Sequence, residues 1–426
     1  MKKRKHVVVI GCGFAGLSAV RALAEYIDLD VTVIDKKNHH LFQPLLYQVA
    51  TGELNPDNIA SPIRSLLSKY ENVRVIRDEV TTVSLKEQIV YTDTEKFTYD
   101  YLVSACGAIH SYFGNEKWED YAPGLKTLEG ALEIRNRIFN AYEIAEKEDD
   151  PEISKQYLTF VVVGGGPTGV ELAGAIADIA HLIILRDYRK INPELSKVIL
   201  VEGGDRLLAP FSKKNSAKAQ KFLEDKGVDV ITSNHVSNID ENGVTIGKDL
   251  HIKAKTVLWG AGVKAVGVLG SNDIEHDRAG RVVVEMDLSL KDYPNVFVIG
   301  DEANSKDRHG NPHPGVATVA LQQGHRAGRN IVREIEGKKR WNFFYFNRGK
   351  AATIGKNKAV LECWKFRTSG LMAWVMWLGI HIWFLAGLQN RIFVLMQWGW
   401  FYIFHRGEAR IIMEKDWHSF PVAKKE

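Results

Sequence analysis

The sequence predicts an α/β fold made of two similar strand-turn-helix units followed by a C-terminal helical segment. Three observations lead to this prediction. An apolar strand runs into a glycine turn and a helix at residues 6–16, the same pattern returns at 158–169, and the region 371–404 is mostly apolar and rich in aromatic residues. Because repeated units of this kind form parallel sheets covered by helices, we expect two Rossmann-like dinucleotide-binding domains. The apolar region 371–404 predicts a C-terminal membrane-associated helical segment.

The first glycine turn has the spacing Gly-x-Gly-x-x-Gly. Gly11 permits the sharp turn, Gly13 lets the backbone approach a pyrophosphate, and Gly16 lets the helix pack on its strand. The N-terminus of that helix favours the negative charge of the phosphates. A second apolar strand ends at Asp35, about 20 residues past the last glycine, where an acid binds ribose hydroxyls. A bound dinucleotide is therefore expected, and a glycine turn that binds nothing is the alternative.

Length and composition narrow the class of protein. A chain of 426 residues suggests two or three domains, and a formal net charge of +4 gives no basic excess that would make nucleic acid the leading partner. Three cysteines, Cys12, Cys106 and Cys363, exclude a dense disulfide framework and fit a reducing compartment. The basic N-terminus is followed by an apolar run of four or five residues, too short for a signal peptide, so we expect a chain that is not exported.

The segment after the first unit is predicted to surround the same ligand. Residues 36–52 indicate a loop and a short helix, and they lack the closely spaced cysteine pair of a disulfide reductase, so dithiol exchange is not expected. Small residues near Gly107 let the backbone approach a flat cofactor. Cys106 is expected to be a buried small hydrophobe rather than a reactive thiol. Short strands are expected at residues 73–80, 88–92 and 99–107.

The second unit follows a helical pattern at 131–139 and a solvated loop at 146–151. Two such units suggest one dinucleotide held firmly and a second one visiting. The second strand of this unit ends at Glu202, about 33 residues past the last glycine, and we attribute the excess to an insertion at 185–194. An acid there disfavours a 2′-phosphate, so NADH is expected over its phosphorylated form. Arg206 lies close enough to soften this preference, and an acid that only caps a helix is the alternative.

Three later segments complete the expected site. Residues 251–263 mirror the strand and glycine turn near Gly107. An apolar strand ends at Asp301, whose carboxylate is suited to accept a hydrogen bond from a ribityl hydroxyl of a flavin. A helix is expected to begin near Ala317, and its N-terminal amide groups favour negative charge on a reduced flavin ring.

These residues resemble the type II NADH dehydrogenases, the NADH:quinone oxidoreductases that do not pump protons. The resemblance covers nearly the whole chain. It is carried by the first glycine turn with Asp35, residues 39–52, residues 164–171, Gly300-Asp301, the helix at Ala317 and the aromatic tail. The resemblance implies non-covalent FAD, NADH as substrate, a membrane quinone as acceptor and a monotopic homodimer on the cytoplasmic face of the inner membrane.

The resemblance also implies which residues bind each ligand. Glu171 is expected near the nicotinamide and flavin, and Gln322 in the segment that lines the quinone site; these are the two expected catalytic residues. An ordinary helix acid is the alternative for Glu171, and no metal site is expected. The FAD residues are Gly11, Gly13, Phe14, Ala15, Gly16, Asp35, Lys36, His40, Gln43, Val80, Ala105, Cys106, Gly107, Asp301, Ala317, Thr318 and Val319. The NADH residues are Gly164, Gly166, Pro167, Thr168, Gly169, Glu171, Glu202, Gly260, Ala261 and Gly262, and the quinone residues are Thr318, Leu321, Gln322 and Gln323.

One position departs from the family pattern. The quinone motif is commonly Ala-Gln-x-Ala-x-Gln-x-Gly, and here Thr318 stands at the first glutamine. A hydroxyl still donates and accepts, but it is shorter than an amide. The expected domains are residues 1–115 for the first part of the FAD domain, 116–265 for the NADH domain with a connecting helix, 266–338 for the second part of the FAD domain, and 339–426 for the region of membrane anchoring and dimerisation.

The C-terminal tail is predicted to associate with a membrane. No charged residue occurs from Thr368 to Asn390, and seven of the ten tryptophans follow residue 360. This density favours the headgroup layer, with Arg391, Arg406 and Arg410 available to anionic lipid. We expect two helices lying in one leaflet. A single span is an alternative by length alone, and burial in a dimer interface is another.

Two other functions fit the same motifs. A sulfide:quinone oxidoreductase shares such a fold and tail but needs cysteines near the flavin, for which Cys106 and Cys363 are the candidates. A flavin-bearing redox-sensing or interaction protein with little turnover would also need only the two glycine turns and the apolar tail.

Overall fold

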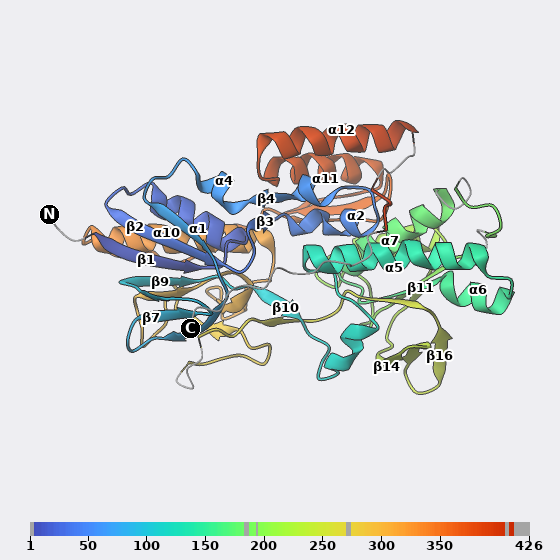
Figure 1. The fold of residues 1–426 in the computed structure, drawn as a ribbon, viewed down its shortest axis with the longest axis horizontal. Coiled ribbons are helices and arrows are strands. Elements are labelled where there is room, and N and C mark those ends of the chain that lie inside the picture. The colour runs from blue at the N-terminus through green and yellow to red at the C-terminus, as the bar shows by residue number, and fades with distance from the viewer. Residues whose placement is uncertain (1–3, 183–186, 193–194, 270–273, 405–408, 413–426) are drawn as a thin grey trace.

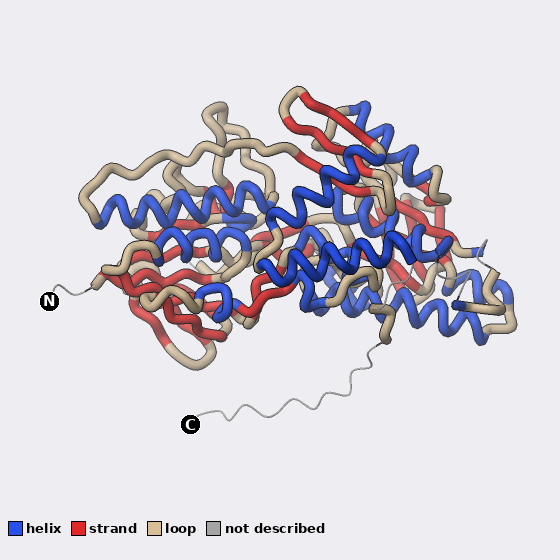
Figure 2. The backbone as a smooth tube through the Cα atoms, turned by 90° about the horizontal axis from the view of Figure 1, so that it is seen from above, coloured by secondary structure: helices blue, strands red, loops and turns tan. Residues whose placement is uncertain are grey.

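The computed structural model describes residues 4–182, 187–192, 195–269, 274–404 and 409–412. Two lobes lie side by side along the long axis (Figures 1 and 2), and a layer of two C-terminal helices lies over their junction (Figure 1). Parts of the predicted insertion at 185–194, and Arg406, lie outside the described residues.

A five-stranded parallel sheet forms the first lobe, with the order β20-β9-β1-β2-β5. Its central strand carries the run Val7-Val8-Val9, which is fully buried, as expected for a parallel sheet covered on both faces. The strands are β1 (Lys5–Ile10), β2 (Leu29–Asp35), β5 (Val73–Arg77), β9 (Tyr101–Ser104) and β20 (Val296–Val298).

Two helices pack closely on the first sheet, α1 (Phe14–Ala24) and α10 (Ala317–Ile335). The two helices also lie close to each other. Gly328 of α10 makes this possible, because a Cβ there would lie only 2.8 Å from the carbonyl oxygen of Ala19 on α1. The Ser18 hydroxyl also donates a hydrogen bond to the Leu321 carbonyl at 2.7 Å. The predicted start of α10 at Ala317 is confirmed, and this packing fixes where that start lies.

A four-stranded parallel sheet forms the second lobe, with the order β13-β12-β11-β17. This order repeats β5-β2-β1-β9 of the first lobe, so the two units predicted from the glycine turns share one topology. The strands are β11 (Thr159–Val163), β12 (Lys197–Val201), β13 (Val228–Ile231) and β17 (Thr256–Trp259). The helices of this lobe are α5 (Leu128–Lys147), α6 (Pro151–Tyr157), α7 (Pro167–Leu182) and α9 (Lys213–Glu224).

In each lobe a small antiparallel sheet precedes the last strand of the common topology, β9 in the first lobe and β17 in the second. Two further strands connect the lobes. The sheet of the first lobe is β6 (Val80–Ser84), β7 (Ile89–Thr92) and β8 (Lys96–Thr98). The sheet of the second is β14 (Val236–Asp240), β15 (Gly243–Ile246) and β16 (Leu250–Lys253). The connecting strands are β10 (Ala108–His110) and β18 (Val263–Ala265), which pair antiparallel.

Residues 36–52 form the predicted loop and short helix, with one added strand. His39–Leu41 is β3 and pairs with β4 (Ala60–Pro62). The remaining short elements are η1 (Gln43–Leu45), α2 (Leu46–Ala50), α3 (Pro56–Ile59), α4 (Ile63–Leu67), η2 (Glu116–Asp120), β19 (Val282–Val283), η4 (Gly300–Glu302) and β21 (Ala303–Asn304).

The C-terminal region is a hairpin sheet and two helices. The sheet consists of β22 (Lys350–Thr353), β23 (Ala359–Cys363) and β24 (Phe366–Ser369), and it carries α11 (Leu371–Phe384) and α12 (Leu388–Phe404). Trp377 and Trp398 join the two helices with ring centroids 5.9 Å apart. Among the helices that the structure describes, none combines the length and apolarity needed to cross a bilayer.

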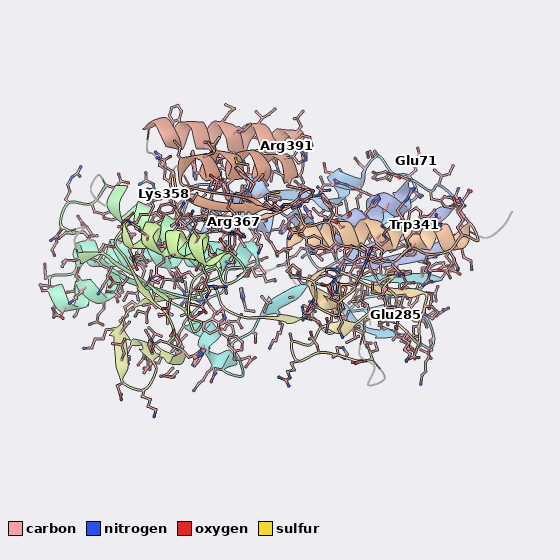
Figure 3. All side chains as sticks on the ribbon, turned by 180° about the vertical axis from the view of Figure 1, so that it is seen from behind. Glu71, Glu285, Trp341, Lys358, Arg367 and Arg391 are labelled. Atoms are coloured by element: carbon pink, nitrogen blue, oxygen red, sulfur yellow. The ribbon has the colours of Figure 1, made fainter. Side chains whose placement is uncertain are left out.

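Two of the arginines expected to face lipid are engaged within the chain instead. Arg391, which lies in the two-helix layer (Figure 3), donates to the carbonyls of Trp383 at 2.9 Å and Leu385 at 2.8 Å. It thereby satisfies carbonyls at the C-terminus of α11. Arg410 forms an ion pair with Asp187. The expectation that both guanidinium groups are available to lipid is therefore wrong.

Candidate active site

The first glycine turn leads from β1 into α1 and leaves one position open. Gly11 has φ +86°, and a Cβ there would overlap the Ala105 carbonyl oxygen. A Cβ at Gly16 would overlap the Gly11 carbonyl oxygen. At Gly13, by contrast, no protein atom lies within 4 Å of the added carbon. The packing of the protein itself requires the outer two glycines, whereas the middle one leaves room for a ligand.

The second glycine turn, between β11 and α7, repeats this geometry. Gly164 has φ +110°, and a Cβ there would lie 2.8 Å from the Ala261 amide nitrogen. A Cβ at Gly169 would overlap the Gly164 carbonyl oxygen, and one at Gly166 would again meet nothing within 4 Å. In both turns, therefore, protein atoms leave no room for a side chain at the first and last glycines, whereas the middle glycine faces free space.

The acids at the ends of the second strands hold these turns through main-chain amides. Asp35 Oδ2 accepts a hydrogen bond from Cys12 N at 2.6 Å, and burial raises the pKa of its carboxyl. Glu202 accepts from Gly165 N at 2.5 Å and from Gly204 N at 2.6 Å, so its carboxylate binds two turns and caps no helix. The neighbouring Arg206 guanidinium donates to the Ala209 carbonyl at 2.6 Å.

A cavity of 320 Å³ lies beside the first glycine turn. Most of the residues predicted to hold FAD line it. These are Gly11, Gly13, Phe14, Ala15, Asp35, Lys36, Gln43, Val80, Ala105, Cys106, Gly107, Asp301 and Ala317. His40 lies behind this wall, with Nδ1 2.9 Å from the Cys12 carbonyl and its ring edge-on to Phe14 at 5.3 Å. Gly16 packs behind the turn, and Thr318 and Val319 face other cavities.

A second cavity of 530 Å³ lies between the lobes and under the C-terminal helices. It shares Phe14, Gln43, Lys126, Asp301 and Ala317 with the first, so the two cavities adjoin. From the second lobe, Pro167, Thr168, Glu171, Gly260 and Gly262 line it, and from the C-terminal region, Ala351 and His381. Five other predicted NADH residues do not line this cavity. Gly164, Gly166 and Gly169 form the turn itself, Glu202 accepts from the turn at Gly165 N, and Ala261 packs against Gly164.

Glu171 is a buried acid in the wall of the second cavity. Its side chain is 8% exposed in the first turns of α7. The backbone N–H of Thr353, on β22, lies 3.4 Å from its Oε1. Burial raises the pKa of Glu171 to about 8, so the carboxyl carries a proton at neutral pH.

Lys126 is a site residue that sequence reasoning missed. Its ammonium group forms an ion pair with Asp301 at 3.2 Å, and both side chains are mostly buried. It lies in the connection before α5, where no motif marks it. Asp301, which was predicted to accept a hydrogen bond from the flavin, is therefore paired with the Lys126 ammonium group, and Lys126 lines both cavities.

The N-terminal half of α10 presents two faces to two cavities. Val319 and Gln323 line the cavity between the lobes, and Gln323 is held there by bonds from Gly300 N at 2.7 Å and to Ser305 Oγ at 2.6 Å. The predicted quinone residues Thr318, Leu321 and Gln322 instead line a third cavity of 360 Å³ beside Phe384 of α11.

Two polar side chains of this third cavity, Thr318 and Gln322, already have partners within the protein. Thr318 Oγ1 lies 2.9 Å from the Tyr345 hydroxyl. The Gln322 amide donates to the Phe346 carbonyl at 3.0 Å and accepts from the Phe346 N–H at 2.9 Å. Gln322 therefore holds the backbone of Phe346 against α10.

All three cysteines are free thiols. Cys106 lies beside the first cavity, where burial raises the pKa of its thiol well above the usual range. Its N–H donates to the buried Glu302 carboxylate at 2.9 Å. A thiol in this environment is not a ready nucleophile, as expected, although Cys106 is half-buried and not fully buried.

Comparison with known proteins places this geometry in a family. Residues 5–324 match the family described as pyridine nucleotide-disulphide oxidoreductase. A Mycobacterium tuberculosis relative, named type II NADH:quinone oxidoreductase NdhA, is 42% identical over 424 residues, covering 96% of this chain and 88% of the relative. The chain belongs to the type II NADH:quinone oxidoreductases.

Solved structures of low sequence identity share the fold of this type II oxidoreductase. The structure of NDH2 from Plasmodium falciparum in complex with NADH superposes with a TM-score of 0.87 at 18% identity, covering 96% of this chain and all of that one. The sulfide:quinone oxidoreductase of Aquifex aeolicus gives a TM-score of 0.73 at 20% identity, covering 91% and 92%. The resemblance predicted from the motifs is confirmed, as is the α/β fold with its C-terminal helices.

Proposed function

We propose that this oxidoreductase takes a hydride from NADH at its second lobe, uses FAD held non-covalently in its first lobe, and reduces a quinone that enters from a membrane, without pumping protons. The observation that carries the proposal is the cavity of 530 Å³, because both dinucleotide lobes and the C-terminal helix α11 line it. Such a cavity brings a nicotinamide, a flavin and an apolar acceptor to one place.

The first lobe fits FAD in three respects. Gly13 leaves space where a pyrophosphate approaches, the N-terminus of α1 faces that space, and Asp35 lines the cavity beside it. When bound, the flavin would accept the hydride and pass on two electrons. The Lys126 ammonium and the N-terminus of α10 would favour negative charge near Ala317.

The second lobe fits NADH by the same reasoning. Gly166 leaves the open position, and the Glu202 carboxylate would repel the 2′-phosphate of NADPH. Glu171 lines the cavity that the nicotinamide would enter, and its neutral carboxyl is suited to place that ring or to donate a proton. Proton donation would supply one of the two protons that a quinone takes up with its two electrons.

We propose that the quinone passes the third cavity on its way in. Thr318 and Leu321 would line its path, and Gln322 would hold the wall at Phe346 in place. Phe384 lines this cavity and His381, one helical turn earlier, lines the cavity between the lobes. One face of α11 would therefore line the path of the quinone from the third cavity to the cavity between the lobes.

The two C-terminal helices are proposed to lie on a bilayer surface, on the cytoplasmic side of the inner membrane. Their outward faces carry large apolar side chains at least a third exposed, far more than single scattered residues. These are Leu371, Met372, Val375, Met376, Ile380 and Trp383 on α11, and Leu388, Ile392, Phe393, Leu395, Met396 and Trp400 on α12. A homodimer is also proposed, as the family resemblance implies.

An anaerobic titration tests the proposed function. NADH should bleach the flavin absorbance of the purified protein, and a soluble quinone should restore it with one quinone consumed per NADH. A colourless protein that takes up no FAD would refute the proposal. Bleaching without reoxidation by quinone would favour a redox-sensing protein, and bleaching by sulfide that needs Cys106 or Cys363 would favour a sulfide oxidoreductase.

A further inference from the structure

His381 is the one titratable residue of α11, a helix that is otherwise apolar. Its ring turns away from the outward apolar face and lines the cavity between the lobes, together with Glu171 and Phe14. The side chain stacks on Trp377 with centroids 3.9 Å apart and planes at 29°, and it meets Phe42 edge-on at 6.2 Å. The aromatic contacts on two sides fix the plane of the imidazole.

The hydrogen bond of His381 fixes its tautomer. Nδ1 lies 2.7 Å from the Trp377 carbonyl oxygen, one turn earlier in the same helix. A carbonyl only accepts, so Nδ1 carries the hydrogen. Burial lowers the pKa of His381 to about 4, so the ring is neutral and Nε2 presents a lone pair. No residue in the described part of the chain makes a hydrogen bond with Nε2.

An acceptor with no protein partner in a cavity wall selects for a ligand that donates. A quinone has only carbonyl acceptors and cannot pair with Nε2. Its reduced product, the hydroquinone, carries two hydroxyl groups that donate. The surrounding wall, with Phe14, Leu46 and Tyr47, suits a flat ring.

We propose that His381 Nε2 accepts a hydrogen bond from a hydroxyl of the hydroquinone formed in this cavity, and so binds the product more tightly than the substrate. The inference rests on the proposed function. In the overall reaction the quinone gains two electrons and two protons: NADH supplies the electron pair and one proton as hydride, and solvent supplies the other proton. Pairing at Nε2 stabilises the reduced form and favours electron transfer towards the quinone.

The test compares His381→Phe with the wild type. Phenylalanine keeps a ring on Trp377 and removes Nε2. The inhibition constant of a soluble short-chain hydroquinone should rise about tenfold, the loss expected for one partly buried hydrogen bond. The KM for the matching quinone should stay within about twofold, and anaerobic bleaching of the flavin by NADH should be unchanged. Calorimetric titration of the reduced protein with the hydroquinone should show the same tenfold loss.

Two further variants separate binding from structure. His381→Gln offers an amide oxygen as acceptor and should recover most of the hydroquinone affinity. His251→Phe makes the same exchange on the exposed strand β16 and should change nothing. Equal losses for quinone and hydroquinone, or no loss for either, would overturn the role of His381. A wild-type protein that neither reduces the quinone nor binds the hydroquinone would instead overturn the proposed function, and the role of His381 with it.

Discussion

Gly13 and Gly166 occupy the same position in two separate glycine turns, and a Cβ added at either would meet no protein atom within 4 Å. A Cβ at the first glycine of each turn, Gly11 or Gly164, would meet the backbone that follows a neighbouring strand, and one at the last, Gly16 or Gly169, would meet the carbonyl oxygen of that first glycine. The packing of the chain therefore does not require glycine at these two positions, and each leaves the space that we propose for a pyrophosphate.

Gly13→Ala should fold normally and lose its flavin. The added methyl group occupies the space proposed for the pyrophosphate, so we expect the flavin content of the purified protein to fall at least about tenfold. Absorbance per mole of protein measures the loss, and the unfolding temperature of the apoprotein should match that of flavin-stripped wild type. Gly16→Ala is the contrasting variant: it should fail to accumulate in folded form, because its Cβ overlaps the Gly11 carbonyl.

Gly166→Ala should separate the two dinucleotide sites. We expect normal flavin content and a KM for NADH raised about tenfold or more, since only the second turn is altered. A variant that lost flavin and kept its KM for NADH would show that the two turns have been assigned to the wrong ligands.

Glu202→Gln should weaken the preference for NADH over NADPH. The substitution removes the negative charge and keeps one amide oxygen to accept from Gly165 N. We expect the ratio of kcat/KM for NADPH to that for NADH to rise about tenfold, because a like charge no longer faces the 2′-phosphate. Asp229→Asn is the control, since it removes an exposed carboxylate from the adjacent strand β13. A ratio unchanged in Glu202→Gln would remove the acid from coenzyme selection.

The pH dependence of quinone reduction should report on Glu171. Its carboxyl is neutral below about pH 8, so proton donation by it should fail as the pH rises through that value. Stopped-flow reoxidation of the reduced protein by quinone should slow above about pH 8 in the wild type, and Glu171→Gln should be slow and flat across the range. Reduction of the flavin by NADH should also slow in the variant if Glu171 places the nicotinamide. Wild-type kinetics in both half-reactions would leave Glu171 an ordinary helix acid.

The same group should affect stability with a definite sign. The folded-state pKa of Glu171 is raised above the ordinary carboxyl value of 4.5, so its contribution is complete below that value and is lost as the pH rises through about 8. Denaturant midpoints of the apoprotein at about pH 5 and about pH 8 should therefore differ less in Glu171→Gln than in the wild type.

Trp383→Glu should release the protein from vesicles. Trp383 is 73% exposed on α11, and a charge there opposes burial in the headgroup layer. Sedimentation with anionic vesicles should fall at least about fivefold, and flavin bleaching by NADH should persist. Ile27→Glu changes a side chain that is equally exposed, at the turn between α1 and β2, and should leave sedimentation unchanged. A drop in oligomer size without loss of vesicle binding would place this face in a dimer interface.

Local patterns in the sequence predicted the parts of the site that local sterics determine. The two glycine turns and the start of α10 at Ala317 follow from residues close together in the chain, so they were predictable. Lys126 and His381 were not recognised as site residues, because each enters a cavity through contacts between distant segments. Arg391 was misjudged for a different reason: its partners lie nearby in the chain, but they are backbone carbonyls at the end of the preceding helix, which no charge pattern reveals.

Because α11 closes one side of the cavity between the lobes, the tail cannot be treated as a detachable tether. If the chain were shortened before Gly370 to improve its solubility, the cavity between the lobes would lose the wall that α11 provides. A detergent that displaces α11 from the rest of the protein should for the same reason inhibit the enzyme, and so should a compound that binds between α11 and the two lobes.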